Sequence, residues 1–171
     1  MRMRMKTMVL VGAALVGAVA GTSAMSAMSA AEIPAGKLEK LVKLYVPMQE
    51  TLAGDAAAAV AAQAAKVATE AEAILQSKGD KPSLEAIEDL EAIVAAAKGM
   101  KAKEIAGLRE QFKPLSRSVG RLVERQAVAG HGIYFCPMAD AYWVQKSGAV
   151  KNPYYGSKML GCGEAVAKVA D

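Results

Sequence analysis

Two short groups near the C-terminal end of the chain each combine a thiol with a thioether. Cys136 and Met138 form the first group, and Met159 and Cys162 form the second. Thiolate and thioether sulfur are soft donors that favour Cu(I), whereas oxygen donors suit magnesium or calcium. A tetrahedral zinc site needs a fuller set of Cys and His ligands, and this segment adds only His131. The residue types therefore favour copper over zinc, and silver by the same chemistry.

His131 is a further candidate ligand. It stands between Gly130 and Gly132, where backbone freedom allows the imidazole to approach a metal. A lone histidine in a loop is more often solvated, so both interpretations of His131 stay open.

A nucleophilic pair of His131 with Cys136 is the enzymatic interpretation of the same residues. No accompanying motif supports it, because the chain has neither G-x-S-x-G nor H-E-x-x-H. We therefore predict that the protein is not an enzyme.

The first 31 residues have the pattern of a secretory signal peptide. Three basic residues open the chain, an uncharged run follows at 8–20, and small residues fill 21–31. A helix that spans a bilayer needs about 20 apolar residues, so we expect no stable membrane anchor. We predict cleavage of residues 1–31 and a single exported, periplasmic domain at 32–171.

Export changes the charge balance. Three of the 21 basic residues and none of the 17 acidic ones lie in the signal peptide, which leaves 18 against 17. The exported domain is then nearly neutral. We predict no nucleic-acid partner, because the charge gives no electrostatic reason for one.

Export also makes a disulfide between Cys136 and Cys162 a direct alternative to metal binding. Such a bond closes a loop over residues 136–162 and contributes about 3 kcal/mol in the chain-entropy model. The two interpretations are compatible if the pair is oxidised when empty and binds metal when reduced.

Residues 37–126 have the composition and periodicity of an antiparallel helical bundle. We predict three or four helices, at about 38–52, 56–76, 84–99 and 105–122. Pro47 and Pro114 are expected to kink the first and last helix without ending them.

The last helix carries basic residues at every fourth position, which places them along one slowly turning stripe. This pattern predicts a solvated face or, as the functional alternative, a surface for a protein partner. The stripe consists of Arg109, Lys113, Arg117, Arg121 and Arg125.

The C-terminal segment 130–164 differs from the bundle. It contains six of the eight aromatic residues of the chain and many glycines and prolines. We predict a loop-rich segment with at most a short hairpin, docked on the helices, and hence an all-α fold class.

Four strings in this segment resemble the signature of a bacterial exported domain family of unknown function. They are YFCPMA, YW, NPYYG and MLGCGE, which begin at residues 134, 142, 152 and 159. An R-x-x-F-x-x-L-S element that begins at Arg109 resembles the same family. This family occurs alone and fused to periplasmic adaptor subunits of copper and silver efflux systems.

The resemblance implies a heavy-metal context and a turn that brings the two sulfur groups together, formed by Asn152, Pro153 and Gly156. It implies the four sulfur residues as ligands, shielded by Trp143 and the tyrosines, and it does not include His131. We therefore predict a periplasmic protein that sequesters or transfers Cu(I) or Ag(I), with an efflux adaptor or metallochaperone as partner. The alternative is a disulfide-stapled helical interaction module of the cell envelope without metal.

Overall fold

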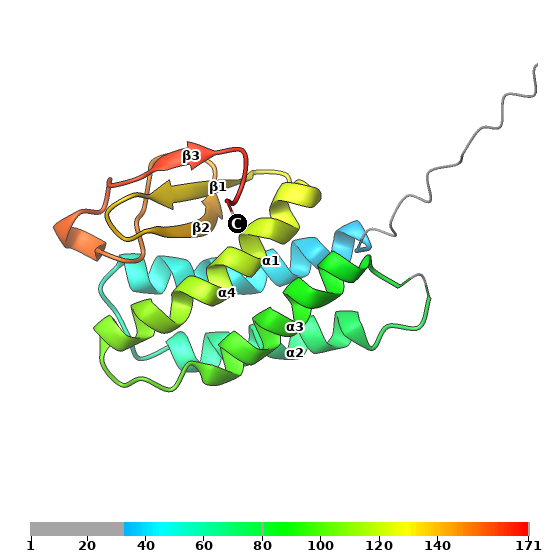
Figure 1. Ribbon diagram of the computed structural model, residues 1–171. Coiled ribbons are helices and arrows are strands. Elements are labelled where there is room, and N and C mark those ends of the chain that lie inside the picture. Colours follow the sequence, from blue (N-terminus) through cyan, green and yellow to red (C-terminus); the bar gives the residue numbers. More distant parts are fainter. Residues whose placement is uncertain (1–32, 80, 171) are drawn as a thin grey trace, which may run out of the picture.

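The computed structural model of the protein describes residues 33–79 and 81–170, so the predicted signal peptide at 1–31 lies outside the described residues. Helices come first along the described chain, and strands follow (Figure 1). In order, the elements are α1 (Ala35–Ala53), α2 (Val60–Leu75), α3 (Leu84–Gly99), α4 (Ile105–Arg125), β1 (His131–Cys136), β2 (Ala141–Lys146), the 3₁₀ helix η1 (Gly156–Lys158) and β3 (Glu164–Val166). None of the described helices combines the length and apolar character needed to cross a bilayer.

The predicted all-α fold class is wrong, because the segment predicted as loops forms a three-stranded antiparallel sheet with strand order β2-β1-β3. The protein is therefore an α+β domain. Each face of the sheet is covered. On one face Ile133 lies against Gly120 of α4, and on the other Trp143 is fully buried beside Gly163. Because both faces are covered, the strands lack the alternation of apolar and polar residues that reveals a half-buried strand.

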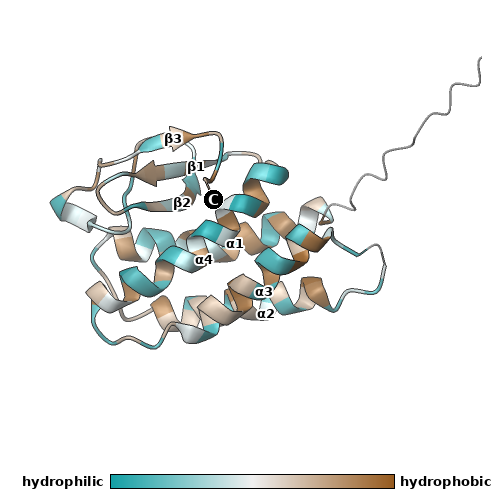
Figure 2. Cartoon of the chain, in the orientation of Figure 1, coloured by the Kyte–Doolittle hydropathy of each residue, from teal (hydrophilic) through white to brown (hydrophobic). Residues whose placement is uncertain are grey.

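The helices lie close to their predicted positions. α1 and α4 continue through Pro47 and Pro114, and the side chain of Ser83 caps α3 by accepting a hydrogen bond from the backbone of Ala86. Figure 2 shows that each helix carries both hydrophobic and hydrophilic residues, as expected for helices that bury only one side.

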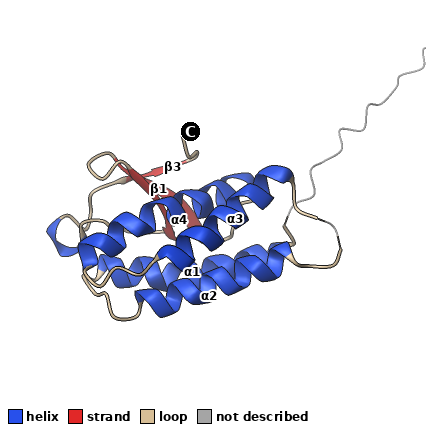
Figure 3. Ribbon diagram, turned by 60° about the horizontal axis from the view of Figure 1, so that its bottom comes forward, coloured by secondary structure: helices blue, strands red, loops and turns tan. Residues whose placement is uncertain are grey.

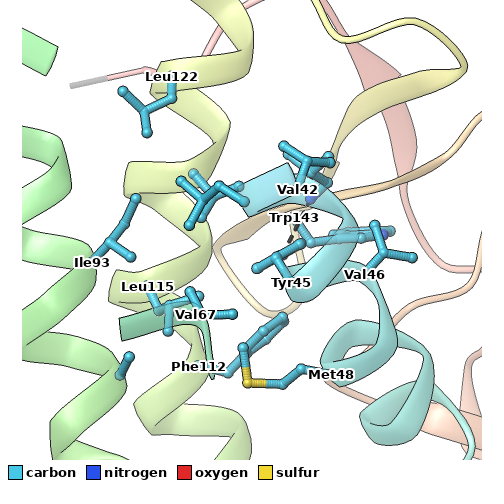
Figure 4. Close-up of a cluster of buried hydrophobic side chains, with 14 of the residues drawn as sticks. Val42, Tyr45, Val46, Met48, Val67, Ile93, Phe112, Leu115, Leu122 and Trp143 are labelled. Carbon is cyan, nitrogen blue, oxygen red and sulfur yellow. Dashed lines mark hydrogen bonds between the residues drawn. The ribbon is translucent and has the colours of Figure 1, made fainter. Parts of the chain in front are cut away.

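The elements form three layers. The sheet packs on α1 and α4, and these two helices in turn cover α2 and α3 (Figures 1 and 3). One cluster of buried side chains runs through the layers and includes Trp143 of β2 (Figure 4). The rings of Tyr45 and Phe112 stack with centroids 5.3 Å apart, and Tyr154 lies 6.0 Å from both Phe112 and Trp143. The sheet is therefore a continuation of the helical core.

Two buried tyrosines close the outer edge of β2. The backbone N–H of Val144 donates to the Tyr45 hydroxyl at 3.3 Å, and the Tyr154 hydroxyl donates to the carbonyl of Tyr142. Burial raises the pKa of both phenols, so the hydroxyls stay neutral. These bonds satisfy backbone groups that an open strand edge would otherwise expose.

The basic stripe of α4 is not simply a solvated face, because its side chains have partners within the molecule. Arg121 and Arg125 both pair with the carboxylate of Asp89, whose side chain is only 4% exposed. The other pairs join Arg109 to Asp55, Lys113 to Glu110, and Arg117 to the carbonyl of Ala170. The stripe therefore connects α4 to α3, to the α1–α2 connection and to the end of the described chain.

Candidate metal centre

The structure brings the two cysteines together at one end of the sheet. Cys136 is the last residue of β1 and is fully buried, whereas Cys162 lies just before β3 and is half-buried. Their sulfur atoms are 3.1 Å apart although the residues are 26 positions apart in the sequence. The antiparallel pairing of β1 with β3, in which Phe135 faces Glu164, places them side by side.

Both candidate methionines lie in turns beside the cysteines. Met138 belongs to the turn between β1 and β2 and is 65% exposed, and Met159 is 37% exposed. The carbonyl of Met159 accepts a hydrogen bond from the backbone of Cys162 at 2.9 Å. By contrast, Met48 and Met100 are buried in the core. The two thioethers near the cysteines are therefore accessible from solvent, and Met138 does not fill the core.

Aromatic rings cover the buried side of the sulfur pair. Register and alternation place Tyr134, Cys136 and Trp143 on the same face of the sheet. The rings of Tyr134 and Trp143 stack with centroids 5.6 Å apart. A Cβ atom at Gly163 would lie 2.5 Å from the Trp143 ring, and the φ of Gly163 is +134°. Only glycine fits there, one residue after Cys162.

The turn 152–156 contacts both sulfur groups. Asn152 is fully buried, and its side-chain amide donates to the carbonyl of Cys162 at 2.6 Å. The side-chain oxygen of Asn152 accepts from the backbone N–H of Tyr154 at 2.7 Å. The hydroxyl of Tyr155 donates to the carbonyl of Met138 at 3.0 Å. The turn that carries Asn152, Pro153 and Gly156 thus connects the segment of Cys162 to the hairpin turn after Cys136.

A buried glutamine, Gln145, supports the loop that follows β2, and no pattern in the sequence predicts this role. Gln145 accepts hydrogen bonds from the Trp143 indole and from the backbone of Lys151, both at 2.9 Å, and donates to the carbonyl of Ala149 at 2.8 Å. It therefore fixes the loop after β2 and satisfies the buried indole N–H.

Arg109 and Asp55, which we call the Asp55–Arg109 clamp, hold the far side of the same turn. The guanidinium of Arg109 donates to the carbonyls of Pro153 at 2.8 Å and Leu52 at 2.9 Å, and it lies 2.7 Å from one carboxylate oxygen of Asp55. The other carboxylate oxygen accepts from the backbone N–H of Ser157 at 2.8 Å. The clamp thus connects α4 and the α1–α2 connection to this turn.

Gly156 is required by the clamp. Its φ is +56°, and a Cβ atom there would lie 2.0 Å from the Asp55 carboxylate and 2.4 Å from the Arg109 guanidinium. The clamp therefore fits closely around the backbone of the turn.

The pH dependence of stability tests the clamp. Hydrogen bonds from Ser157, and then the bond and charge of Arg109, hold the pKa of Asp55 well below its usual range. A lowered pKa means that the contribution of Asp55 is present above its unfolded pKa and is lost as pH falls through the folded value. We expect Asp55→Asn to lower Tm by a few degrees, with a difference from wild type that persists from about pH 7 to about pH 4.

Thermal melts of the two proteins across this pH range measure that difference. Asn is a suitable replacement because Asp55 has a φ of 57°, and Asn tolerates this conformation. Glu50→Gln serves as the control, because it removes an exposed pair with Lys146 that contributes little. A difference that is already lost between about pH 6 and about pH 5, above the ordinary pKa of a carboxylate, would contradict the interpretation.

The structure does not bring His131 to the sulfur pair. His131 begins β1 and Cys136 ends it, so roughly 16 Å separate them at about 3.3 Å per residue. Alternation also places their side chains on opposite faces of the sheet. The His131 ring nitrogen instead lies 3.0 Å from the carbonyl of Ala129. Over residues 33–79 and 81–170, no three His, Cys, Asp or Glu side chains gather as a metal site.

The separation of the two sulfur atoms can be compared with the distances found in a metal site and in a disulfide. Two sulfur atoms that share a tetrahedral metal at about 2.3 Å lie about 3.8 Å apart, whereas a disulfide bond is about 2.05 Å long. The separation of 3.1 Å lies between these values, so either state requires the two sulfur atoms to move relative to each other. The two thiols, with accessible thioethers two and three residues away in the sequence, offer the soft donors that Cu(I) or Ag(I) favours.

Comparisons of the chain with protein-family models, with curated protein sequences and with solved structures find no match. The structure itself defines an α+β domain with a pair of thiols, one buried and one half-buried, at the end of its sheet.

Proposed function

We propose that this protein binds Cu(I), or Ag(I), through Cys136 and Cys162 and sequesters or transfers the ion in the periplasm. The observation that carries the proposal is the 3.1 Å separation of two sulfur atoms held by different parts of the fold. Two thiolates at such a distance act as a chelate, because binding of the first places the second at a high effective concentration.

The accessible thioethers support transfer as well as storage. Met138 and Met159 are exposed on the two turns that flank the thiol pair. Thioether sulfur is a neutral soft ligand that suits Cu(I). An ion handed over by a partner can therefore contact sulfur at the surface before it reaches the half-buried Cys162 and the buried Cys136. The proposed partner is an efflux adaptor or a metallochaperone.

The redox state of the pair sets whether the site is available. Oxidation of the two thiols to a disulfide releases two electrons and two protons to the oxidant, and it removes both thiolate ligands. The same short distance thus favours a second function, a disulfide-stapled module that docks on an envelope component. The two functions differ in whether the reduced protein binds copper.

Competition for Cu(I) tests the proposal. The full exported domain is prepared with the cysteines reduced and, separately, with the pair oxidised, and each sample is titrated against a chromogenic Cu(I) chelator. We expect the reduced protein to withdraw one Cu(I) per chain from the chelator and the oxidised protein to withdraw none. The oxidised protein is the matched control, because it has the same sequence and differs only by the loss of two protons and two electrons and the S–S bond that joins the cysteines.

The same samples separate the two functions. Equal copper binding by the reduced and oxidised proteins would refute the proposed thiolate site. If the reduced protein binds no copper and the oxidised protein melts at a clearly higher temperature, the pair is a structural staple.

A further inference from the structure

We infer that the Asp55–Arg109 clamp positions Cys162 for its encounter with Cys136, so that Arg109 and Asp55 are positioning residues of the sulfur pair. The inference rests on the dithiol of the proposed function, but it does not require copper. The two cysteines are held in different ways.

Cys136 is held by the sheet. It ends β1, the central strand, which pairs with β2 on one side and β3 on the other, and its side chain is fully buried. Its backbone position is therefore fixed by strand pairing.

Cys162 has a weaker hold on the sheet. It lies outside β3, which has only three residues and is largely exposed. Apart from the strand pairing, its backbone N–H donates to the carbonyl of Met159, and its carbonyl accepts from the side chain of Asn152 at 2.6 Å. The position of Cys162 relative to Cys136 thus depends on the turn that carries Asn152.

The clamp holds that turn to the helices. Arg109 lies in the second turn of α4, its side chain is 13% exposed, and it binds the carbonyl of Pro153, the residue that follows Asn152. Asp55 follows α1 and binds the backbone of Ser157. The turn is therefore fixed on both sides of Gly156 by residues from other elements, and a continuous set of contacts leads from Arg109 through Asn152 to Cys162.

The chemical consequence concerns effective concentration. A turn that is fixed keeps the Cys162 sulfur near the Cys136 sulfur, which favours intramolecular reactions of the pair. Loosening the clamp lowers this effective concentration and makes the disulfide easier to reduce. A clamp that only stabilised the fold would leave the thiol–disulfide equilibrium of the folded protein unchanged.

Equilibration of the exported domain with dithiothreitol measures this effect. In the reaction the protein dithiol and oxidised dithiothreitol give the protein disulfide and reduced dithiothreitol, with two electrons and two protons transferred. We expect Arg109→Lys to lower the equilibrium constant for disulfide formation about 10-fold, or about 30 mV for a two-electron couple. Lysine keeps the charge but cannot reproduce the planar fork that reaches three acceptors.

Two further variants make the result decisive. Arg121→Lys is the matched control, because it changes the same residue type on the same helix and disturbs the Asp89 pair instead. It should keep the wild-type equilibrium constant. Gly156→Ala retains both Asp55 and Arg109 in the sequence but adds a Cβ atom that would lie 2.0 Å from the Asp55 carboxylate, so the clamp has to shift. It should lower the constant as Arg109→Lys does.

The inference is overturned if Arg109→Lys, folded by circular dichroism in the reduced state, has the wild-type constant. It is also overturned if Arg121→Lys lowers the constant equally. If Arg109→Lys does not fold, Gly156→Ala decides by the same criterion. None of these results involves copper, so the proposed metal binding and the positioning role fail or hold separately.

Discussion

Replacement of Cys136 by serine is expected to weaken Cu(I) binding by the reduced protein about 100-fold or more. The variant keeps one thiol, Cys162, and so loses the advantage of chelation, which typically amounts to two or more orders of magnitude. The serine hydroxyl does not compensate, because it is a hard donor that Cu(I) does not favour. Titration against a chelator of known Cu(I) affinity measures the loss.

Cys162→Ser is the companion variant, and it separates ligand loss from misfolding. Cys136 is fully buried whereas Cys162 is half-buried, so the serine at position 136 costs more stability because its hydroxyl is buried. We expect both variants to lose copper affinity similarly. Met48→Leu, a replacement in the core that conserves volume, controls for general effects of sulfur loss. Retention of wild-type affinity by either cysteine variant would refute a two-thiolate site.

The helices could be predicted from the sequence because their signal is local. In α4 the apolar residues recur at intervals of three and four along a single face, and residues such as Phe112 and Leu115 are fully buried. Propensity and periodicity of this kind are properties of a window of about 15 residues. The four helices of the described chain accordingly lie where this pattern is found.

The sheet could not be predicted because its strands lack that signal. β2 buries Trp143, Val144 and Gln145 in succession. This burial pattern has neither the period of two of a half-buried strand nor the period of 3.6 of a helix. The strand is enclosed between α4 and the loop that follows it, and enclosure on both faces removes the alternation. The glycines that suggested loops instead allow the close approach of that loop to the sheet, as at Gly163.

The sequence identified the two cysteines and the turn at 152–156, but not the residues that hold this turn to the helices. The two cysteines were recognised from residue type, and the structure places their sulfur atoms 3.1 Å apart. His131 was included because it is the sole histidine of the segment, but strand geometry separates it from the pair. The role of Arg109 was missed because its acceptors, on Pro153 and Asp55, are more than 40 residues away in the sequence. Such pairing depends on the packing of distant elements.

The second large effect is expected when Trp143, in the core beneath the sulfur pair, is replaced. Trp143→Ala should lower the free energy of unfolding by about 3–5 kcal/mol, which is the range for removing a large aromatic side chain from a core. Trp143 is fully buried, stacks on Tyr134, meets Tyr154 edge-on and donates to Gln145. Urea denaturation of the reduced protein, followed by circular dichroism because Trp143 is the sole tryptophan, measures the change.

Trp143→Phe separates the contribution of ring packing to stability from that of the indole N–H hydrogen bond. Phenylalanine keeps most of the apolar contact, and the Gln145 side-chain oxygen retains its bond from the backbone of Lys151, so the cost should be well below that of the alanine variant. A cost below about 1.5 kcal/mol for Trp143→Ala would mean that the sheet is not part of the main core.

Because Gly163 packs on the same ring, the cavity left by alanine also frees the residue next to Cys162. The core that stabilises the domain therefore also keeps the half-buried cysteine facing its buried partner.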